Sequence, residues 1–485
     1  MKNSSSLYQS LLDEKEGVAE EKLVLYQAVT ERHVQALWLE QKYLKPLRTV
    51  DGQSVVVRSP GMWNAEAGPD FRKAHLCVNG EEWIGDVELH LHDKGWTQHS
   101  HHNDLRYNQV ILHVSLWQQQ ASLELRTQSG DILPQLYLEP HLTVNPARLA
   151  HLFDIELYPY RHCTGSGRCS FPIFQEKRET TIQELLESAA TWRLEQKRRF
   201  LKERAGCAPQ SFAAGAAMVL GYRGNAETFL ELFLYLNSQT HADEDTLLSS
   251  AMGCCGFFDC NKDVWVKSKE YQRLLTLWRE QSHRWPRRFQ IETRPNRPLN
   301  HPIRRLAALS GWLFSGSLPH AYERIKQVWQ SQWVKLKKPR DFVRLRQEWN
   351  SAIAVPKHPY WNTHYLFETG CAPRPVPLVG QGAKIAILLN AGLPLLWEEI
   401  CLRGDPQEKE VFFSAYRSLQ PADSGKRRYL THRFFGDSAK GLSLKKGSME
   451  QGAFQIHKDF CTHYEASCEG CPFVDRVVSH LELNK

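Results

Sequence analysis

The stretch that decides the fold of the N-terminal region is residues 71–92, FRKAHLCVNGEEWIGDVELHLH. Its two halves, 71–78 and 83–92, are rich in strand-forming residues, and Asn79-Gly80 between them is typical of a tight β-hairpin turn. Side chains alternate between the two faces of a strand. Within residues 86–92, one face therefore carries four ionisable groups, Asp86, Glu88, His90 and His92, and the other carries Val87, Leu89 and Leu91. Core packing does not explain such a face, and we expect a polar site on it.

The turn also sets the register of the hairpin. If residues 78–80 form a three-residue loop, the numbers of paired residues sum to 158, and Asp70 lies opposite Glu88 with Cβ atoms about 5 Å apart. A two-residue loop instead pairs Asp70 with Leu89 and leaves the two carboxylates diagonal to each other. Both registers keep the carboxylates close, and such neighbours repel unless a proton or a cation separates them.

The segments around this hairpin indicate a mixed α/β domain. A helical pattern precedes it at about 20–43. The other strands expected are 54–58, 110–117, 122–127 and 132–138, with a second hairpin turn at 129–131. A helix, then strands, a short helical segment and a further strand favour an α/β domain with a mixed sheet, which we assign to residues 1–157.

The rest of the chain is predicted to be mostly α-helical. A segment rich in Pro, Gly, Ser and Cys opens a loop or linker at 158–178, and the helical region extends over 179–485. The helices expected there are 181–204, 226–237, 268–283, 302–314, 321–335, 342–351 and 383–402.

Length and composition limit the class of protein. The chain has 485 residues, enough for two or three domains, and its net charge of +7 permits a nucleic-acid partner without requiring one. No uninterrupted apolar run approaches the roughly 18 residues that span a membrane. The start of the chain lacks the apolar segment of a secretory signal, and the twelve cysteines are irregularly spaced. We expect a cytoplasmic protein without a membrane partner.

The polar residues of the first hairpin suggest a hydrolytic metal site. Asp70 and Glu88 offer oxygen ligands that suit Mg²⁺ or Mn²⁺, and such an ion can activate water against a phosphodiester. His90 is placed to contact that water or the phosphate, with Asp86 and His92 as second candidates. The residues expected to bind substrate or orient the site are His99, His102, Tyr107 and His113.

Pro69-Asp70, a hairpin and then Glu88-Leu89-His90 resemble the restriction-endonuclease-like superfamily pattern of Pro-Asp followed by Asp or Glu, any residue, and Lys. The resemblance implies a restriction-endonuclease-like fold, with Asp70 and Glu88 binding a metal for nuclease activity. The sequence departs from the pattern at His90, which occupies the lysine position but lacks the permanent charge of lysine at pH 7.

A second resemblance covers most of the chain. The segments 59–61, 68–71, 85–90 and 107–114 resemble a bacterial domain-of-unknown-function family, and Arg297-Pro298 and 390–396 continue the match. This resemblance implies no particular activity.

Three cysteines near the C-terminus form a Cys-x6-Cys-x2-Cys pattern: Cys461, Cys468 and Cys471. A Cys-x2-Cys pair can hold one metal between two thiolates, and three cysteines with a further ligand also suit an iron–sulfur cluster. We predict zinc or an iron–sulfur cluster here. The candidates for a fourth ligand are Cys163, Cys169, Cys371, Cys401, His457 and His463.

Two helical segments, 192–204 and 329–349, mix basic and aromatic residues. Such surfaces can neutralise phosphates and stack bases, but they arise equally from core aromatics whose Lys and Arg neighbours point outward. The predicted function is a metal-dependent nuclease or a nuclease-like nucleic-acid-binding protein, with these helices guiding the substrate. The alternative is a non-catalytic, metal-stabilised structural or interaction protein.

Overall fold

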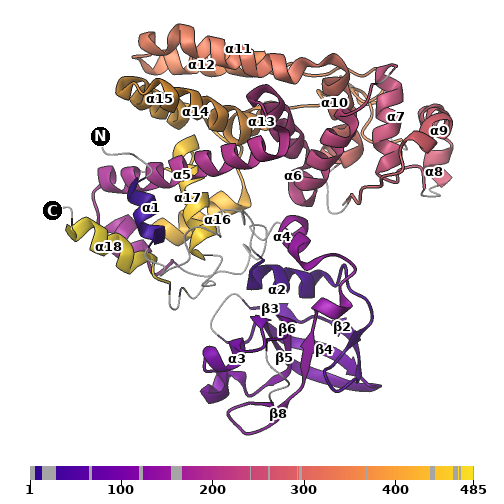
Figure 1. Cartoon of the computed structure of the whole chain (residues 1–485), viewed down its shortest axis with the longest axis vertical. Coiled ribbons are helices and arrows are strands. Elements are labelled where there is room, and N and C mark those ends of the chain that lie inside the picture. The colour runs from indigo at the N-terminus through magenta and orange to yellow at the C-terminus, as the bar shows by residue number, and fades with distance from the viewer. Residues whose placement is uncertain are drawn as a thin grey trace. The chain divides into compact units, whose positions relative to one another are not determined.

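A computed structural model describes residues 6–13, 29–64, 68–119, 124–153, 166–240, 242–259, 263–291, 293, 298–367, 370–436, 443–461, 468 and 471–483. A mixed sheet occupies the N-terminal part of the chain and helices make up most of the remainder, as predicted (Figure 1). The chain forms two compact units. One contains residues 1–6, 186–423 and 444–452, and the other contains residues 7–185, 424–443 and 453–485.

The sheet is built from seven strands. They are β1 Leu47–Arg48, β2 Ser54–Ser59, β3 Met62–Trp63, β4 Phe71–Val78, β5 Glu81–His92, β6 Val110–Trp117 and β9 Gln135–Tyr137. Their order is β1-β2-β4-β5-β6-β9, with β3 beside β4. The pairs from β1 to β5 are antiparallel, whereas β6 runs parallel to β5 and β9 parallel to β6. A short separate hairpin joins β7 Leu125–Arg126 to β8 Ile132–Leu133.

The first hairpin reaches its final register in two steps. Asn79 and Gly80 form a two-residue turn with positive φ of 49° and 93°, and the pairs from Val78–Glu81 to Ala74–Gly85 follow from it. A bulge then shifts the register so that Phe71 pairs with Val87. The bulge adds one residue to β4, so Asp70 comes opposite Glu88 even though the loop has two residues.

The bulge has its own side-chain support. Lys73 in the bulge has a positive φ of 55°, and its backbone N–H donates a hydrogen bond of 3.0 Å to Asp86 Oδ1. Asp86, a second candidate for the metal site, therefore stabilises the irregularity that aligns the two carboxylates.

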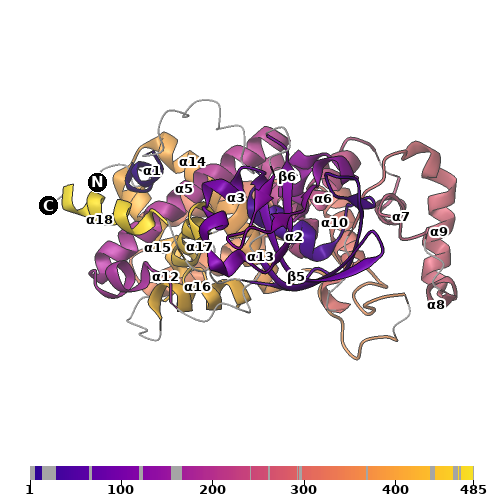
Figure 2. The same ribbon diagram turned by 90° about the horizontal axis from the view of Figure 1, so that it is seen from below.

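One face of the sheet packs against helix α2, Glu31–Glu40 (Figure 2). The helix ends at Gln41, whose φ of 50° is left-handed, and residues 20–28 of the predicted helix lie outside the described residues. The core between α2 and the sheet is apolar and includes Val34, Leu37, Trp38, Phe71, Val87, Leu89, Leu112 and Val114.

The connection from β5 to β6 covers part of the sheet face opposite to α2. It consists of α3 Gly95–Gln98 and the short helices η2 His101–Asn103 and η3 Leu105–Tyr107. A second small core contains Trp96 and Tyr107 from this connection, together with Val110, Leu125 and Leu133. The crossover thus packs over the polar face of β5, which carries Glu88 and His90.

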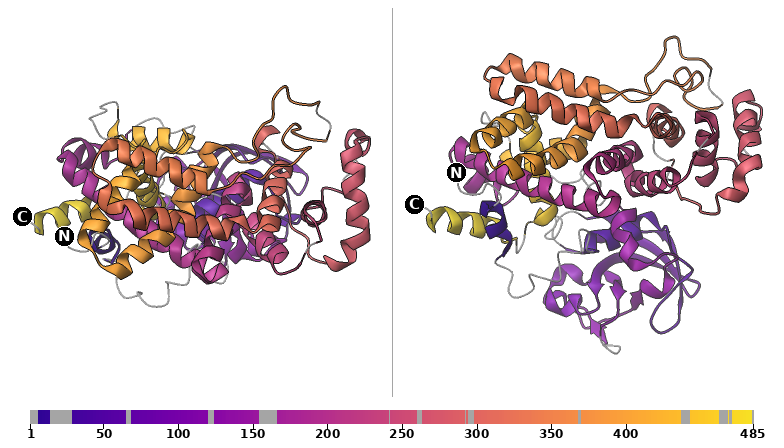
Figure 3. Two further views of the ribbon diagram at one scale, coloured as in Figure 1. Left: turned by 90° about the horizontal axis from the view of Figure 1, so that it is seen from above. Right: turned by 45° about the horizontal axis from the view of Figure 1, so that its top comes forward.

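The helical part is longer than the sheet region. Its helices are α5 Glu179–Ala205, α6 Ala208–Asn237, α7 Glu244–Cys254, α8 Asp263–Val266, α9 Lys269–Gln281, α10 Pro302–Ser315, α11 Ser317–Gln332, α12 Pro339–Ala352, α13 Gln381–Ile387, α14 Leu393–Arg403 and α15 Pro406–Ser418. Helices α11 and α12 pack side by side (Figure 3). The sequence pattern predicted most of these helices but not α7, α8 or α15, and it predicted α6 only from residue 226.

The continuous segment Gln381–Arg403 is long and apolar enough to cross a membrane, with a mean hydropathy of 1.6. Of its most apolar window, 61% is buried within the structure. This degree of burial is typical of a core helix in a globular fold.

The unit that holds the sheet also contains helices from both ends of the chain. These are α1 Ser6–Asp13, η7 Ser170–Gln175, α16 Gly425–Phe435, the last part of α17 Gly447–Asp459, and α18 Phe473–Leu483. The ring of Phe174 stacks on Phe434 at 4.4 Å, and Phe460 packs against Phe473 at 4.9 Å. Part of the predicted linker is thus helical, whereas its residues 158–165 lie outside the described residues.

Candidate functional site

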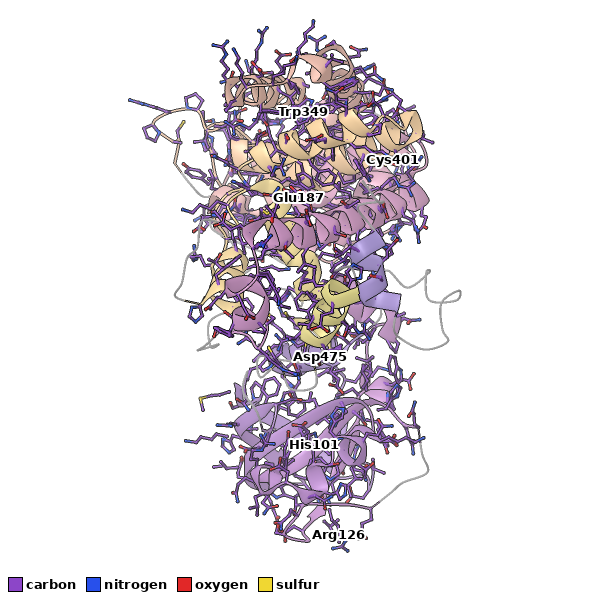
Figure 4. The ribbon with its side chains drawn as sticks, turned by 90° about the vertical axis from the view of Figure 1, so that its left-hand side faces the viewer. His101, Arg126, Glu187, Trp349, Cys401 and Asp475 are labelled. Carbon is purple, nitrogen blue, oxygen red and sulfur yellow. The ribbon has the colours of Figure 1, made fainter. Side chains whose placement is uncertain are left out.

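The candidate site lies on the polar face of β5. Glu88 and His90 come from β5, Asp70 immediately precedes β4, and His113 comes from the parallel strand β6. The crossover after β5 adds His99 and His101; His101 is labelled in Figure 4. A hairpin, a parallel strand and a crossover therefore bring together side chains that are widely spaced in the sequence.

The two carboxylates are buried and held by hydrogen bonds. Asp70 is 2% exposed and Glu88 is 5% exposed. Asp70 Oδ2 accepts from the backbone N–H of Leu89 at 3.0 Å, and Asp70 Oδ1 accepts from Gln35 Nε2 at 2.6 Å. The backbone N–H of Asp70 donates to Glu88 Oε2 at 2.9 Å. These bonds join α2, β4 and β5 and fix the orientation of both carboxylates.

The second oxygen of Glu88 faces imidazoles. Glu88 Oε1 lies 3.1 Å from His101 Nε2 and 3.7 Å from His90 Nε2. His90 Nε2 also lies 3.1 Å from His99 Nδ1. One ring nitrogen from each of His90, His99 and His101 lies within 4.8 Å of the other two. The three imidazoles thus surround one small volume, and Glu88 Oε1 contacts two of them, His90 and His101.

These separations suit a single metal ion. Four ligands about 2.1 Å from an ion at tetrahedral angles lie about 3.4 Å from one another. His90 Nε2 lies 3.1 Å from His99 Nδ1, and Glu88 Oε1 lies 3.1 Å from His101 Nε2 and 3.7 Å from His90 Nε2, all close to that value. Three imidazoles and one carboxylate are donors that suit Zn²⁺, Fe²⁺ or Mn²⁺ better than Mg²⁺, which prefers oxygen ligands.

The protonation state of these histidines favours metal binding, since an imidazole coordinates in its neutral form. Burial and the neighbouring imidazoles lower the pKa of His90 well below its usual value. Burial, followed by the charges of His99 and His113, lowers the pKa of His101 to about 3. Burial lowers the pKa of His113 to about 4 and also depresses that of His99. At neutral pH these rings are uncharged.

His113 is the hydrogen-bond partner of His90 on the far side of its ring from Glu88 and His99. His90 Nδ1 lies 2.9 Å from His113 Nε2, within hydrogen-bonding distance. If His90 donates its Nδ1 proton to His113, His90 Nε2 presents a lone pair toward His99 and Glu88. This hydrogen bond is the type of contact that orients a metal-binding histidine.

A glycine lets the crossover approach His90. A Cβ placed on Gly95 would lie 2.3 Å from the His90 ring, a distance that no side-chain atom tolerates. Gly95 therefore allows the first turn of α3 to pack directly on that ring and hold it in place.

The remaining residues predicted for the site occupy different positions. His99 is exposed and His102 is half-buried beside Asn103. Tyr107 is buried with its ring stacked on His101 at 3.9 Å, and His113 is fully buried. His92 stacks on Trp117 at 5.4 Å.

The prediction gave no role to Gln35 or His101. The only sequence signal for Gln35 was a polar residue within an apolar helix pattern, and for His101 a cluster of neighbouring histidines.

The C-terminal cysteines gather around a separate cavity. Cys461, Cys468 and Cys471 line it together with Cys169, which precedes η7. Of the other ligand candidates within the described residues, Cys371, Cys401 and His457 do not line this cavity. Cys163 and His463 lie outside the described residues.

The two basic helical segments, 192–204 and 329–349, differ in whether their Lys and Arg side chains pair with other helices or are exposed to solvent. In the first, Lys197 donates to Asn390 at 2.5 Å and Arg198 pairs with Glu398 at 2.7 Å, so these cations tie helices together. In the second, Trp329 and Trp349 are buried core residues, whereas five cations are exposed. These are Lys335, Lys337, Lys338, Arg340 and Arg344.

Comparison with known proteins gives a family but no function. No curated protein and no solved structure matches this chain significantly. A family model matches residues 31–424, a range that includes the sheet, the carboxylate–histidine site, Cys169 and most of the helical region but not the three C-terminal cysteines. The chain therefore belongs to the family described as protein of unknown function (DUF2851).

Proposed function

We propose that this protein is a metal-dependent nuclease whose site comprises Asp70, Glu88 and the imidazoles of the β5 face. The observation that carries the proposal is the cluster of His90, His99 and His101, with Glu88 Oε1 beside His90 and His101. Glu88 is held in turn by the backbone of Asp70. Two halves of a Pro-Asp and Glu-x-His motif lie on adjacent strands of a mixed sheet, which supports the restriction-endonuclease-like interpretation.

The histidine in the lysine position has a role in this proposal. His90 is 1% exposed and neutral, so it cannot supply the positive charge that lysine would bring to a phosphate. Its buried Nε2 instead faces Glu88 and His99, which suits a metal ligand. The ion itself would then supply the positive charge and lower the pKa of a bound water.

Asp70 and His99 have different proposed roles: Asp70 supports the site, and His99 marks the side from which substrate reaches it. Asp70 is oriented by Gln35 and Leu89, and because a carboxylate has about four acceptor positions, these hydrogen bonds do not by themselves exclude it as a ligand. His99 is exposed, so a phosphodiester would approach the ion from the side of His99. Nucleic acid is the proposed substrate class, since the net charge of +7 favours a polyanion.

The test is cleavage of labelled single- and double-stranded DNA and RNA by the full chain with Mg²⁺, Mn²⁺ or Zn²⁺. We compare the wild type with Asp70→Asn, Glu88→Gln and His99→Ala. The matched control is His75→Ala, because His75 is a partly exposed histidine of β4 that pairs with Glu82 outside the site. The proposal predicts metal-dependent cleavage that the first three variants lose and His75→Ala keeps. Equal cleavage by all variants, or none by the wild type, would contradict it.

A second function, a metal-stabilised structural or interaction protein, is favoured by a different observation. Asp70 accepts a hydrogen bond from Gln35, and its backbone N–H donates one to Glu88. Together with the bond from Leu89 N–H to Asp70, this network joins α2 to β4 and β5 without any substrate. In that case the wild type binds a metal ion at Glu88 but cleaves no nucleic acid, and loss of the ion lowers stability alone.

A further inference from the structure

The cysteine cavity collects four thiols from distant parts of the chain. Cys169 comes from the segment before η7, Cys461 follows α17, and Cys468 and Cys471 precede α18. Cys169, Cys468 and Cys471 are each less than 10% exposed. Cys461 is partly buried. Four cysteines around one cavity, three of them buried, are not expected from packing alone, since thiols that only fill core space need not gather at one place.

The remaining lining of the cavity is mostly apolar. Ile456, Phe460, Phe473 and Val474 line it beside the sulfurs, and Phe460 and Phe473 pack on each other. Apolar walls exclude water from a metal–thiolate centre and slow its loss and oxidation. The site therefore has the thiolate donors of a metal centre and the surroundings that stabilise one.

A buried cation completes the site. Arg433, at 7% exposed, donates a hydrogen bond of 2.8 Å from Nη2 to Cys468 Sγ. The backbone carbonyl of Arg433 accepts from Gly167 N at 2.7 Å, which fixes the segment that carries Cys169. A centre bound by four thiolates is anionic, and a guanidinium at hydrogen-bonding distance offsets part of the cost of burying that charge.

The sulfur atoms influence one another electrostatically. Burial raises the pKa of Cys169 to about 12, and the Cys468 sulfur adds to this effect. Burial also raises the pKa of Cys461, with further contributions from Cys169, Cys468 and Cys471. A metal binds cysteine as the thiolate, so its binding at this cavity would release protons.

The distances between the four sulfur atoms distinguish a polynuclear cluster from a single metal ion. A zinc ion with Zn–S bonds of about 2.3 Å holds its tetrahedral sulfurs about 3.8 Å apart. Among the described residues, no three of these four sulfurs lie within 4.8 Å of one another, in contrast to the three imidazoles of the β5 site. A polynuclear cluster holds its thiolates farther apart because they bind different irons.

We propose that Cys169, Cys461, Cys468 and Cys471 bind one iron–sulfur cluster, with Cys169 as the fourth ligand of the Cys-x6-Cys-x2-Cys pattern. The cluster joins the segment before α5 to the C-terminal helices. This proposal does not depend on the function proposed for the β5 site, because the two sites share no residue.

The test begins with the full chain, purified without oxygen or reconstituted with Fe²⁺ and sulfide. We expect iron and acid-labile sulfide in equal amounts, broad visible absorption and an EPR signal in one oxidation state. Zinc as the bound metal, or no metal at all, would overturn the proposal. The result for the wild type does not depend on whether any variant folds.

Variants then test the assignment of the ligands. Cys169→Ser should retain at least about tenfold less iron, since even residues that only support a ligand affect metal affinity 10–100-fold. Cys207→Ser, at an exposed cysteine before α6, is the matched control and should keep its iron. Cys169→Asp retains an anionic donor and should bind a cluster with an altered EPR spectrum. Full iron in Cys169→Ser, or an unchanged spectrum in Cys169→Asp, would overturn the role of Cys169.

Discussion

The β5 site and the cysteine cavity differ in how their residues are assembled. The residues of the β5 site come from one helix, one hairpin, one crossover and one further strand, all between residues 35 and 113. The cysteine cavity needs residue 169 together with residues 461–471. A site built from adjacent strands can be located from a short stretch of sequence, whereas a site built across a whole chain requires the fold.

The two sites also differ in what holds them together before a metal binds. Hydrogen bonds connect Asp70, Glu88 and Gln35 directly, so the β5 site has a fixed shape of its own. The cysteine cavity is held by aromatic packing and by Arg433. We therefore expect the cysteine region to depend more strongly on its metal than the β5 site does.

The largest effect should follow removal of the proposed iron–sulfur cluster. A ligand present at about 1,000 times its dissociation constant stabilises the folded state by about 4 kcal/mol, and its loss removes that contribution. We expect Cys468→Ser to melt at a lower temperature than the wild type and to be cleaved by protease within 453–483. Thermal melting and limited proteolysis of the cluster-loaded chain measure this. A variant as stable as the wild type would show that the cavity does not need its cluster.

Removing the Glu88 carboxylate should have the next largest effect. Glu88→Ala leaves the buried N–H of Asp70 and the ring of His101 without their partner, at a cost of about 2–4 kcal/mol. Glu88→Gln retains an oxygen acceptor for Asp70 and should lose less. Urea unfolding of both variants checks the difference, and equal stabilities for the two would contradict the hydrogen-bond network.

A smaller effect is expected at Gly95. Gly95→Ala should force the His90 ring to move, at a cost of about 1–3 kcal/mol from overpacking, and should weaken metal binding at Glu88. Gly425→Ala at the first residue of α16 is the matched control because its Cβ meets no atom within 4 Å. Calorimetric Mn²⁺ titration measures the metal affinity of both variants, and urea unfolding measures their stability. Unchanged Mn²⁺ affinity in Gly95→Ala would argue against His90 as a ligand.

The smallest effect concerns His358, a buried histidine outside both sites. Its Nδ1 accepts hydrogen bonds from the backbone N–H groups of Tyr360 and Trp361, and burial lowers its pKa although Asp245 opposes the shift. Because the folded pKa is depressed, the unfolded chain takes up the proton first. Stability then falls by up to about 1.4 kcal/mol per pH unit as the pH drops below about 6.5.

The check is urea unfolding between pH 7 and pH 5. His358→Gln should reduce the pH dependence of the unfolding free energy relative to the wild type, since glutamine does not titrate there. Because the histidines of the β5 site are unchanged in this variant, the difference between the two curves isolates His358. Identical slopes would mean that His358 does not remain neutral in the fold.

The sequence predicted the β-strands of the first hairpin because alternation and the Asn79-Gly80 turn are local signals. It left the register open, because the bulge at Lys73 depends on a contact with Asp86 that no turn rule contains. The same limit applies to the ligands. His90 was evident on its strand, whereas Gln35 and Cys169 reach their partners only through tertiary packing.

The most direct test of the central claim, that the chain carries two chemically different metal sites, is its metal content resolved by element. The wild type, Cys169→Ser and His99→Ala are reconstituted anaerobically with Fe²⁺ and sulfide and freed with a chelator of Fe²⁺ bound outside the cluster. They are then equilibrated with excess Mn²⁺ and analysed as full chains. We predict iron and manganese in the wild type, loss of iron alone in Cys169→Ser and loss of manganese alone in His99→Ala. Loss of both metals in either variant, or neither metal in the wild type, would contradict two separate sites.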